Sequence, residues 1–127
     1  MKIKTDFTTN SSSSSFVIAV KNGTTREELE NSIPEKEITS FIKEEGEYIY
    51  DLTDALPEDA SLEDKVKYAK HALANDLLNA VKNGMEIGDW KIAAMDGSNE
   101  DGDLTGSFLY SSGWKIDTAI LKTKAFN

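Results

Sequence analysis

A segment with a continuous helical stripe constrains the fold of this chain more than any other feature. Between residues 62 and 82, apolar side chains recur at intervals of three or four positions, which is the spacing of one face of an α-helix. Ser61 is a favourable N-cap, and Asn83-Gly84 is a favourable stop. The stripe consists of Leu62, Val66, Ala69, Leu73, Leu77 and Ala80. We therefore predict an amphipathic helix over residues 62–82 that packs on a flat surface.

Segments rich in β-branched and aromatic residues lie on both sides of this helix and predict the surface that it covers. Residues 16–20 are apolar and bounded by serines, which indicates a buried strand, and residues 1–7 alternate as a second N-terminal strand. The C-terminal third predicts three strands, over residues 89–95, 105–110 and 114–124, with a polar loop at 96–103 and a tight hairpin at 111–113. The predicted fold class is α+β, with an antiparallel sheet of N-terminal strands and a C-terminal three-stranded meander packed by the long helix.

One or two short helices are predicted between the N-terminal strands and the long helix. Overlapping Thr-x-x-Glu patterns at residues 24–28 predict a capping box, and the helix that they open should end before Pro34. Apolar residues between 38 and 42 have helical spacing and predict a second helix. The Tyr-Ile-Tyr sequence at residues 48–50 favours a strand.

Acidic residues concentrate in one segment of the chain. The 127 residues carry 23 acidic and 14 basic side chains, for a net charge of −9. Residues 27–64 hold fourteen of the acids against two lysines, a net charge of −12, so the remainder sums to +3. Such a field attracts basic partners and disfavours direct binding to nucleic acid. The candidate interaction surface consists of Glu27, Glu28, Glu30, Glu44, Glu45, Glu47, Asp51 and Asp54.

Length and composition exclude several classes of protein. A chain of 127 residues is long enough for one domain, which we expect to span residues 1–127, with a core that needs no metal or disulfide. The absence of cysteine excludes a disulfide scaffold and a thiolate zinc site. No apolar run approaches the roughly 20 residues that span a bilayer, and the first residues lack the pattern of a signal peptide. We expect a cytoplasmic protein without a membrane contact.

The residues that could carry chemistry form no coherent catalytic set. His71 is the only histidine, and a hydrolase would need it to meet one of the serines at residues 11–15 across the fold. The loop at residues 96–103 offers oxygen ligands. Counted from Asp96, however, its sixth residue is Asp101 where an EF-hand requires glycine, and the twelfth is Ser107 where an EF-hand requires glutamate. We assign no catalytic, cofactor or metal residue, and we favour a protein that is not an enzyme. A cation at the loop and a ligand at the serines remain open.

The first 18 residues carry a distinctive string in which five serines stand between Asn10 and Phe16. The string resembles the start of a group of small uncharacterised bacterial and phage-associated proteins, which open with Phe-Val-Thr-Asn-Ser-Ser-Ser-Ser-Ser-Phe. Thr8 stands where that group usually has valine. The resemblance implies a bacterial or mobile-element origin and a cytoplasmic setting. It implies no activity and carries over no site residue.

These observations favour a small noncatalytic protein that acts by protein–protein interaction, through its acidic segment at residues 27–64, with a partner that has a basic surface. A more specific alternative is an inhibitor that mimics nucleic acid and occupies a DNA-binding or defence protein. Carboxylates on neighbouring helix turns lie about 5–6 Å apart, which is near the spacing of phosphates along a nucleic-acid strand. Two further alternatives are a small-ligand binder or hydrolase that uses the serine loop, and a virion or assembly component. The identity of the partner and the oligomeric state stay open.

Overall fold

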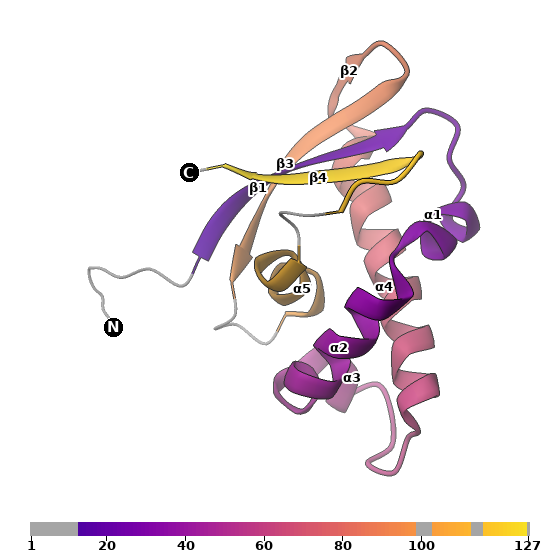
Figure 1. The fold of residues 1–127 in the computed structure, drawn as a ribbon, viewed down its shortest axis with the longest axis vertical. Coiled ribbons are helices and arrows are strands. Elements are labelled where there is room, and N and C mark those ends of the chain that lie inside the picture. The colour runs from indigo at the N-terminus through magenta and orange to yellow at the C-terminus, as the bar shows by residue number, and fades with distance from the viewer. Residues whose placement is uncertain (1–12, 99–102, 113–115, 127) are drawn as a thin grey trace.

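The computed structural model describes residues 13–98, 103–112 and 116–126 and shows a sheet with helices gathered on one side of it (Figure 1). The strands and helices follow one another along the chain as β1 (Ser13–Lys21), α1 (Arg26–Ser32), α2 (Glu35–Glu45), the 3₁₀ turn η1 (Gly46–Tyr48), α3 (Tyr50–Thr53), α4 (Leu62–Lys82), β2 (Met85–Ile87), β3 (Trp90–Ser98), α5 (Leu104–Ser112) and β4 (Leu121–Phe126). The predicted α+β fold class, with a long helix packed on an antiparallel sheet, is confirmed.

β1 is an inner strand of the sheet, whose order is β2-β3-β1-β4 with every pair antiparallel. Ile18 of β1 stands opposite Ala93 of β3 and Thr123 of β4. Because neighbouring residues of a strand point to opposite faces, this register assigns every second residue of β1 to the helix side. The strand predicted at residues 16–20 is therefore present and extends further at both ends.

The hydrophobic core lies between the helix side of the sheet and the helices. Phe16, Ile18 and Val20 of β1 are buried there and lie in one core with Leu73 of α4. Phe108 of α5 is also buried, and its ring meets that of Phe41 on α2 edge to face, with centroids 5.5 Å apart. The core therefore joins the sheet to helices from both halves of the chain.

The long helix α4 has the bounds that its pattern predicts. The hydroxyl of Ser61 accepts a hydrogen bond from the backbone N–H of Asp64 at 3.1 Å, as expected of an N-cap. The buried face keeps Val66, Ala69, Leu73 and Leu77 of the predicted stripe. It also includes Ala74 and Val81, whereas Leu62 is exposed and Ala80 is half-buried. Burial against the sheet and the short helices stabilises this helix more than its composition does.

The strand predicted at residues 48–50 is wrong, because this segment is the junction between η1 and α3. Ile49 is only 2% exposed, whereas Tyr48 and Tyr50 on either side are 64% and 65% exposed. Such alternation imitates the period of a half-buried strand. Here the change from a 3₁₀ turn to an α-helix produces it.

The strand predicted at residues 105–110 is also wrong, because this segment lies in α5. The carboxylate of Asp103 accepts the backbone N–H of Gly106 at 2.7 Å, and that of Asp51 accepts the backbone N–H of Leu104 at 3.0 Å. Together these carboxylates satisfy two of the N–H groups that a helix leaves without partners. The hairpin predicted at residues 111–113 is not formed by Ser111 and Ser112, which end this helix.

The remaining C-terminal predictions are correct in part. The strand predicted at residues 89–95 is β3, which also takes in the first residues of the predicted loop. Within residues 116–124, only the last part lies in a strand, β4, because a turn held by the Thr118 hydroxyl precedes it. The strand predicted at residues 1–7 and the centre of the loop, at residues 99–102, lie outside the described residues.

Candidate protein-binding surface

The fold divides the predicted acidic surface into two groups. Glu27, Glu28 and Glu30 lie on α1, and the other carboxylates lie between the end of α2 and the end of α3. The 11-residue helix α2 connects the two groups, and Glu44 and Glu45 are its last residues. At 1.5 Å per residue this helix is about 16 Å long. Figure 1 shows α1 and α3 at opposite ends of it, so the eight residues do not form one site.

The α1 group is largely engaged in local structure. Glu28 completes a capping box, in which its carboxylate accepts the backbone N–H of Thr25 at 2.9 Å and its own N–H donates to the Thr25 hydroxyl at 3.1 Å. One carboxylate oxygen of Glu30 lies 3.3 Å from Nε of Arg26 and 3.3 Å from Nδ1 of His71. Two of the three acids thus hold α1 in place.

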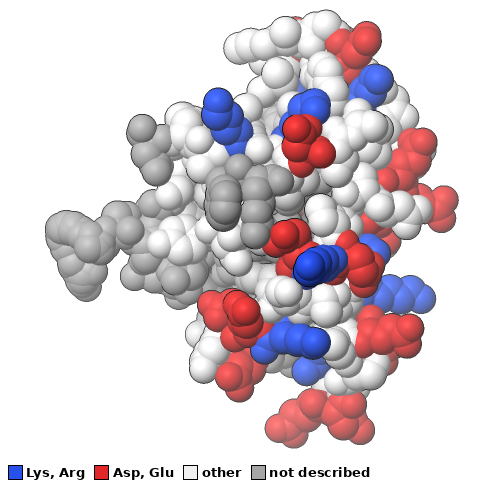
Figure 2. Space-filling model, viewed as in Figure 1, with Lys and Arg blue, Asp and Glu red and all other residues white. Residues whose placement is uncertain are grey.

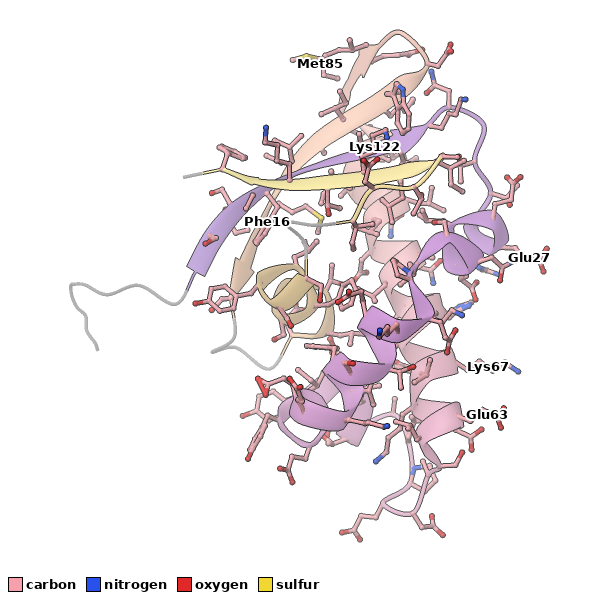
Figure 3. The ribbon with its side chains drawn as sticks, in the orientation of Figure 1. Phe16, Glu27, Glu63, Lys67, Met85 and Lys122 are labelled. Carbon is pink, nitrogen blue, oxygen red and sulfur yellow. The ribbon has the colours of Figure 1, made fainter. Side chains whose placement is uncertain are left out.

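A groove of about 500 Å³ between α1, α2 and α4 carries charges of both signs. Glu35 in its wall is paired with Lys70 of α4, with Nζ and Oε1 2.7 Å apart. Glu63 and Lys67 on α4 line it as well, and Figure 3 shows both side chains on the outer side of that helix. This groove is a poor site for a strongly basic ligand, because its walls carry both positive and negative charges and Glu35 is already paired with Lys70.

The second group has a different character. Glu44, Glu47 and Asp54 are exposed, and the space-filling view shows carboxylates gathered over the helical end of the molecule (Figure 2). Asp51 is exposed as well, although its carboxylate also accepts the N–H of Leu104. That hydrogen bond ties α3 to α5, so the position of this group relative to the core is fixed.

Two exposed tyrosines lie among these carboxylates, and the sequence analysis missed them as site residues. Tyr48 and Tyr50 project outward from either side of Ile49, which anchors the segment in the core. The signal in the sequence was a Tyr-x-Tyr pattern around an apolar residue within an acidic run. We name this surface the acid–tyrosine patch, and it consists of Glu44, Glu47, Tyr48, Tyr50, Asp51 and Asp54.

The acids of this surface change the chemistry of one tyrosine. The pKa of the Tyr48 phenol is raised above its ordinary value of 10.0, first by the hydrogen bond from its hydroxyl to the Glu47 side chain and next by the negative charge of Glu47. The charge of Glu45 adds to this effect. Tyr48 therefore presents a neutral phenol, with a donor engaged by a carboxylate, at physiological pH.

Of the hydrolase candidates that the structure describes, His71 and Ser15 are not brought together. His71 lies on α4 beside Glu30, next to a hollow of about 370 Å³ whose described lining includes Pro57 and Tyr68 but no serine of the run. Ser15 lies in β1, where its hydroxyl donates to the carboxylate of Asp96 at 3.1 Å. Ser11 and Ser12 lie outside the described residues.

The two described carboxylates of the loop, Asp96 and Asp103, accept hydrogen bonds from Ser15 and from the backbone of Gly106. Asp96 lies in β3, and Asp103 caps α5. Across residues 13–98, 103–112 and 116–126, no three histidine, aspartate or glutamate side chains form a group that could hold a metal ion.

No family model, curated protein or solved structure matches this chain. In the described ranges, none of the helices is long and apolar enough to cross a membrane. The function therefore has to be inferred from the chemistry of the surface itself, which combines carboxylates and aromatic rings on an α+β scaffold.

Proposed function

We propose that this chain is a noncatalytic interaction protein that binds a basic surface of a protein partner through the acid–tyrosine patch. The observation that carries the proposal is the exposure of Tyr48 and Tyr50 among carboxylates that also face solvent. Large aromatic side chains are costly to leave in water, and tyrosine is enriched in the centres of protein interfaces. Their position on a rigid turn makes them suitable anchors.

The two residue types of the patch complement each other toward lysine and arginine. Carboxylates such as those of Glu44 and Glu47 form charge-assisted hydrogen bonds with a guanidinium or an ammonium group. A tyrosine ring attracts the same cations through its π face. A basic partner would therefore be steered by the −12 segment and then held by a few desolvated contacts at the tyrosines.

The exposed side chains of the patch are available to a partner because buried residues hold the backbone of this segment in place. Ile49 and Leu52 are buried between the exposed positions. The hydrogen bond from Leu104 to Asp51 adds a link to α5. Binding at this surface therefore requires little ordering of the chain, which lowers the entropic cost of association.

The test is affinity capture followed by measurement of binding. The full chain would be used to capture proteins from a bacterial lysate, since the resemblance of its first residues to bacterial and phage-associated proteins supports that source. The dissociation constant of the purified partner would then be measured over a series of salt concentrations. We expect affinity to fall as ionic strength rises, because exposed charges are screened. We expect the Tyr48→Ala/Tyr50→Ala variant to bind at least about tenfold more weakly.

A matched pair of charge reversals separates the patch from general acidity. Glu47→Lys lies within the patch, and Glu27→Lys makes the same change in net charge on α1. The proposal requires that Glu47→Lys weakens binding markedly while Glu27→Lys has a small effect, with circular dichroism unchanged in both. Equal losses for the two variants, or an affinity that is independent of salt, would refute it.

A further inference from the structure

The face of the sheet that points away from α4 and α5 is apolar. Antiparallel sheets with one solvated face normally carry polar residues on it. Here the register directs apolar side chains from all four strands to this outer face: Val17 and Ala19 of β1, Met85 and Ile87 of β2, Trp90, Ile92 and Ala94 of β3, and Phe126 of β4. No described helix or strand covers these positions, which suggests a surface that is buried in an assembly.

The outer face holds three of the large apolar side chains that are most exposed in the described chain. Met85 is 66% exposed, Ile87 53% and Phe126 48%. Figure 3 shows Met85 on the hairpin at the far end of the molecule from the acidic helices, and Phe16 on the opposite, helix side of the sheet. Both faces of this sheet thus carry many apolar side chains, although the described helices cover only the inner one.

The charges of the outer face are few and are arranged asymmetrically. β4 contributes Lys122 and Lys124, and β1 contributes Lys21 at its last position, whereas β3, on the other side of β1 from β4, contributes Asp96. The ammonium group of Lys122 lies over the Trp90 ring, 5.6 Å from its centroid, and is paired with Asp117. The lysines therefore belong to β4 and to the end of β1, whereas β3 contributes apolar residues and one acid.

We propose that this outer face binds a second copy of the chain, sheet against sheet, about a two-fold axis that runs along β1. The first reason is the distribution of charge. The −12 segment lies in the helical part, on the covered side of the sheet. A sheet-to-sheet dimer places the two acidic segments on opposite outer sides, where their mutual repulsion is smallest.

The second reason is that the face is complementary to itself. A two-fold axis along β1 lays β4 of each copy over β3 of the other. Lys21 lies on this axis at the last position of β1, where its exposed and flexible side chain can reach solvent beyond the end of the sheet. Lys124 then faces the level of Ala94 in the second copy, and Asp96 lies two residues further along the same strand, about 7 Å away. A lysine side chain can span that distance while its methylene groups rest on the apolar surface.

A hollow on the outer face fits the same arrangement. It has a volume of about 490 Å³ and lies beside β4, lined by Val17, Ala19, Lys122 and Lys124 among others. Ile92 stands at the level of Ala19 and Lys122 in the sheet. The two-fold axis would therefore bring Ile92 of the second copy over this hollow.

The size of the face sets the expected strength of the dimer. The four strands contain 27 residues in all. At about 3.3 Å along a strand and 4.8 Å between strands, they offer a flat area of roughly 430 Å² per copy. Two such faces give roughly 860 Å², which is small for a specific interface. We therefore expect a weak dimer whose population depends on concentration.

Sedimentation equilibrium of the full chain tests the proposal. Over a range from about 10 μM to about 1 mM, the mean mass of the wild-type chain should rise from that of one chain toward that of two. A mass that stays at one chain throughout this range would overturn the proposal. Growth beyond two chains would overturn it as well, because a two-fold interface closes on itself.

Substitutions on the axis test its position. Val17 lies on β1, so the two copies of this residue would meet across the axis. Val17→Lys and Val17→Glu should each weaken association by at least about tenfold, because either change sets like charges against each other. Ala55→Lys, on an exposed alanine after α3, is the matched control and should leave the dimer intact. An intact dimer in the Val17 variants would contradict the proposal.

A charge exchange tests the pairing of β4 with β3. Lys124 and Asp96 are both exposed, so variants there should fold, and within one chain β1 separates their strands. Lys124→Asp and Asp96→Lys should each weaken the dimer, and the double variant should recover most of the loss. Additive losses would show that the two residues do not meet across the interface, and the proposed axis would be wrong.

Discussion

Tyr48 shows how single side chains give this surface its chemistry. Its neighbour Ile49 is committed to the core, so the backbone has no freedom to withdraw the phenol from solvent. Glu47 accepts the phenol's hydrogen bond and raises its pKa. The Glu47 carboxylate thus contributes negative charge to the patch and also orients the Tyr48 ring.

A titration of this phenol follows directly. Subtracting the ultraviolet titration of Tyr48→Phe from that of the wild type isolates Tyr48, and we expect this component to titrate above pH 10.0. Glu47→Gln should bring it back toward 10.0, since the largest causes of the shift involve that carboxylate. Because the folded-state pKa is the higher one, the group stabilises the fold below pH 10.0, and this contribution is lost as pH rises through the folded-state value.

The control for this titration is Glu27→Gln, which removes one acid from α1 and leaves the neighbours of Tyr48 unchanged. An isolated Tyr48 component at or below pH 10.0 in the wild type would contradict the hydrogen bond to Glu47. Equal effects of Glu47→Gln and Glu27→Gln on the pKa of Tyr48 would also contradict it.

The helices α4 and α5 differ in how far their own residues specify them. α4 could be predicted with its bounds, because its apolar stripe and its Ser61 cap are local in sequence. α5 could not, because it is buried on nearly all sides and therefore has no hydrophobic period. Its N-terminus is stabilised partly by Asp51, which is 53 residues away in the chain.

The cap of α5 gives a prediction about stability. Asp103→Ala removes the acceptor for the Gly106 N–H and should lower the free energy of unfolding by about 1 kcal/mol, as measured by urea denaturation. Asp59→Ala, at an exposed position before α4, is the matched control and should change it little. If both variants were as stable as the wild type, the cap would not contribute to holding this helix.

The sequence predicts which segment is acidic, but it does not predict how the residues of that segment are arranged on the surface. A count of charges identifies the acidic segment, because net charge is a property of sequence alone. The separation of Glu27 from Glu47 by the length of α2 is a property of the fold. The outward direction of Tyr48 and Tyr50 is also a property of the fold, because it depends on a 3₁₀ turn. Their alternating pattern in the sequence predicts a strand instead.

At the scale of the whole molecule, the acidic charge is a cost to folding as well as an attraction for partners. The fourteen acids within residues 27–64 are balanced by only two lysines, so they repel one another when the short helices form. We expect the melting temperature to rise as sodium chloride brings the ionic strength from about 0.01 to about 0.15 M, where the screening length falls from about 30 to about 8 Å.

Calorimetry of the full chain at fixed concentration measures this effect. Glu44→Gln/Glu47→Gln should reduce the dependence on salt, whereas Lys124→Gln on the sheet should not. A melting temperature that falls with salt over this range would mean that attractions between opposite charges outweigh the repulsion within the acidic segment.

The central position of β1 also determines when the protein can fold during its synthesis. Phe16 pairs with Met95 on one side and with Ala125 on the other, so the strand that is made first receives its partners last. At about 5–20 residues per second, a ribosome needs roughly 5 to 20 s to make the roughly 110 residues between Phe16 and Ala125. Until β3 has been made, which takes most of that interval, neither strand that pairs with β1 is present. The nascent chain is therefore a natural client for a chaperone that shields extended hydrophobic segments.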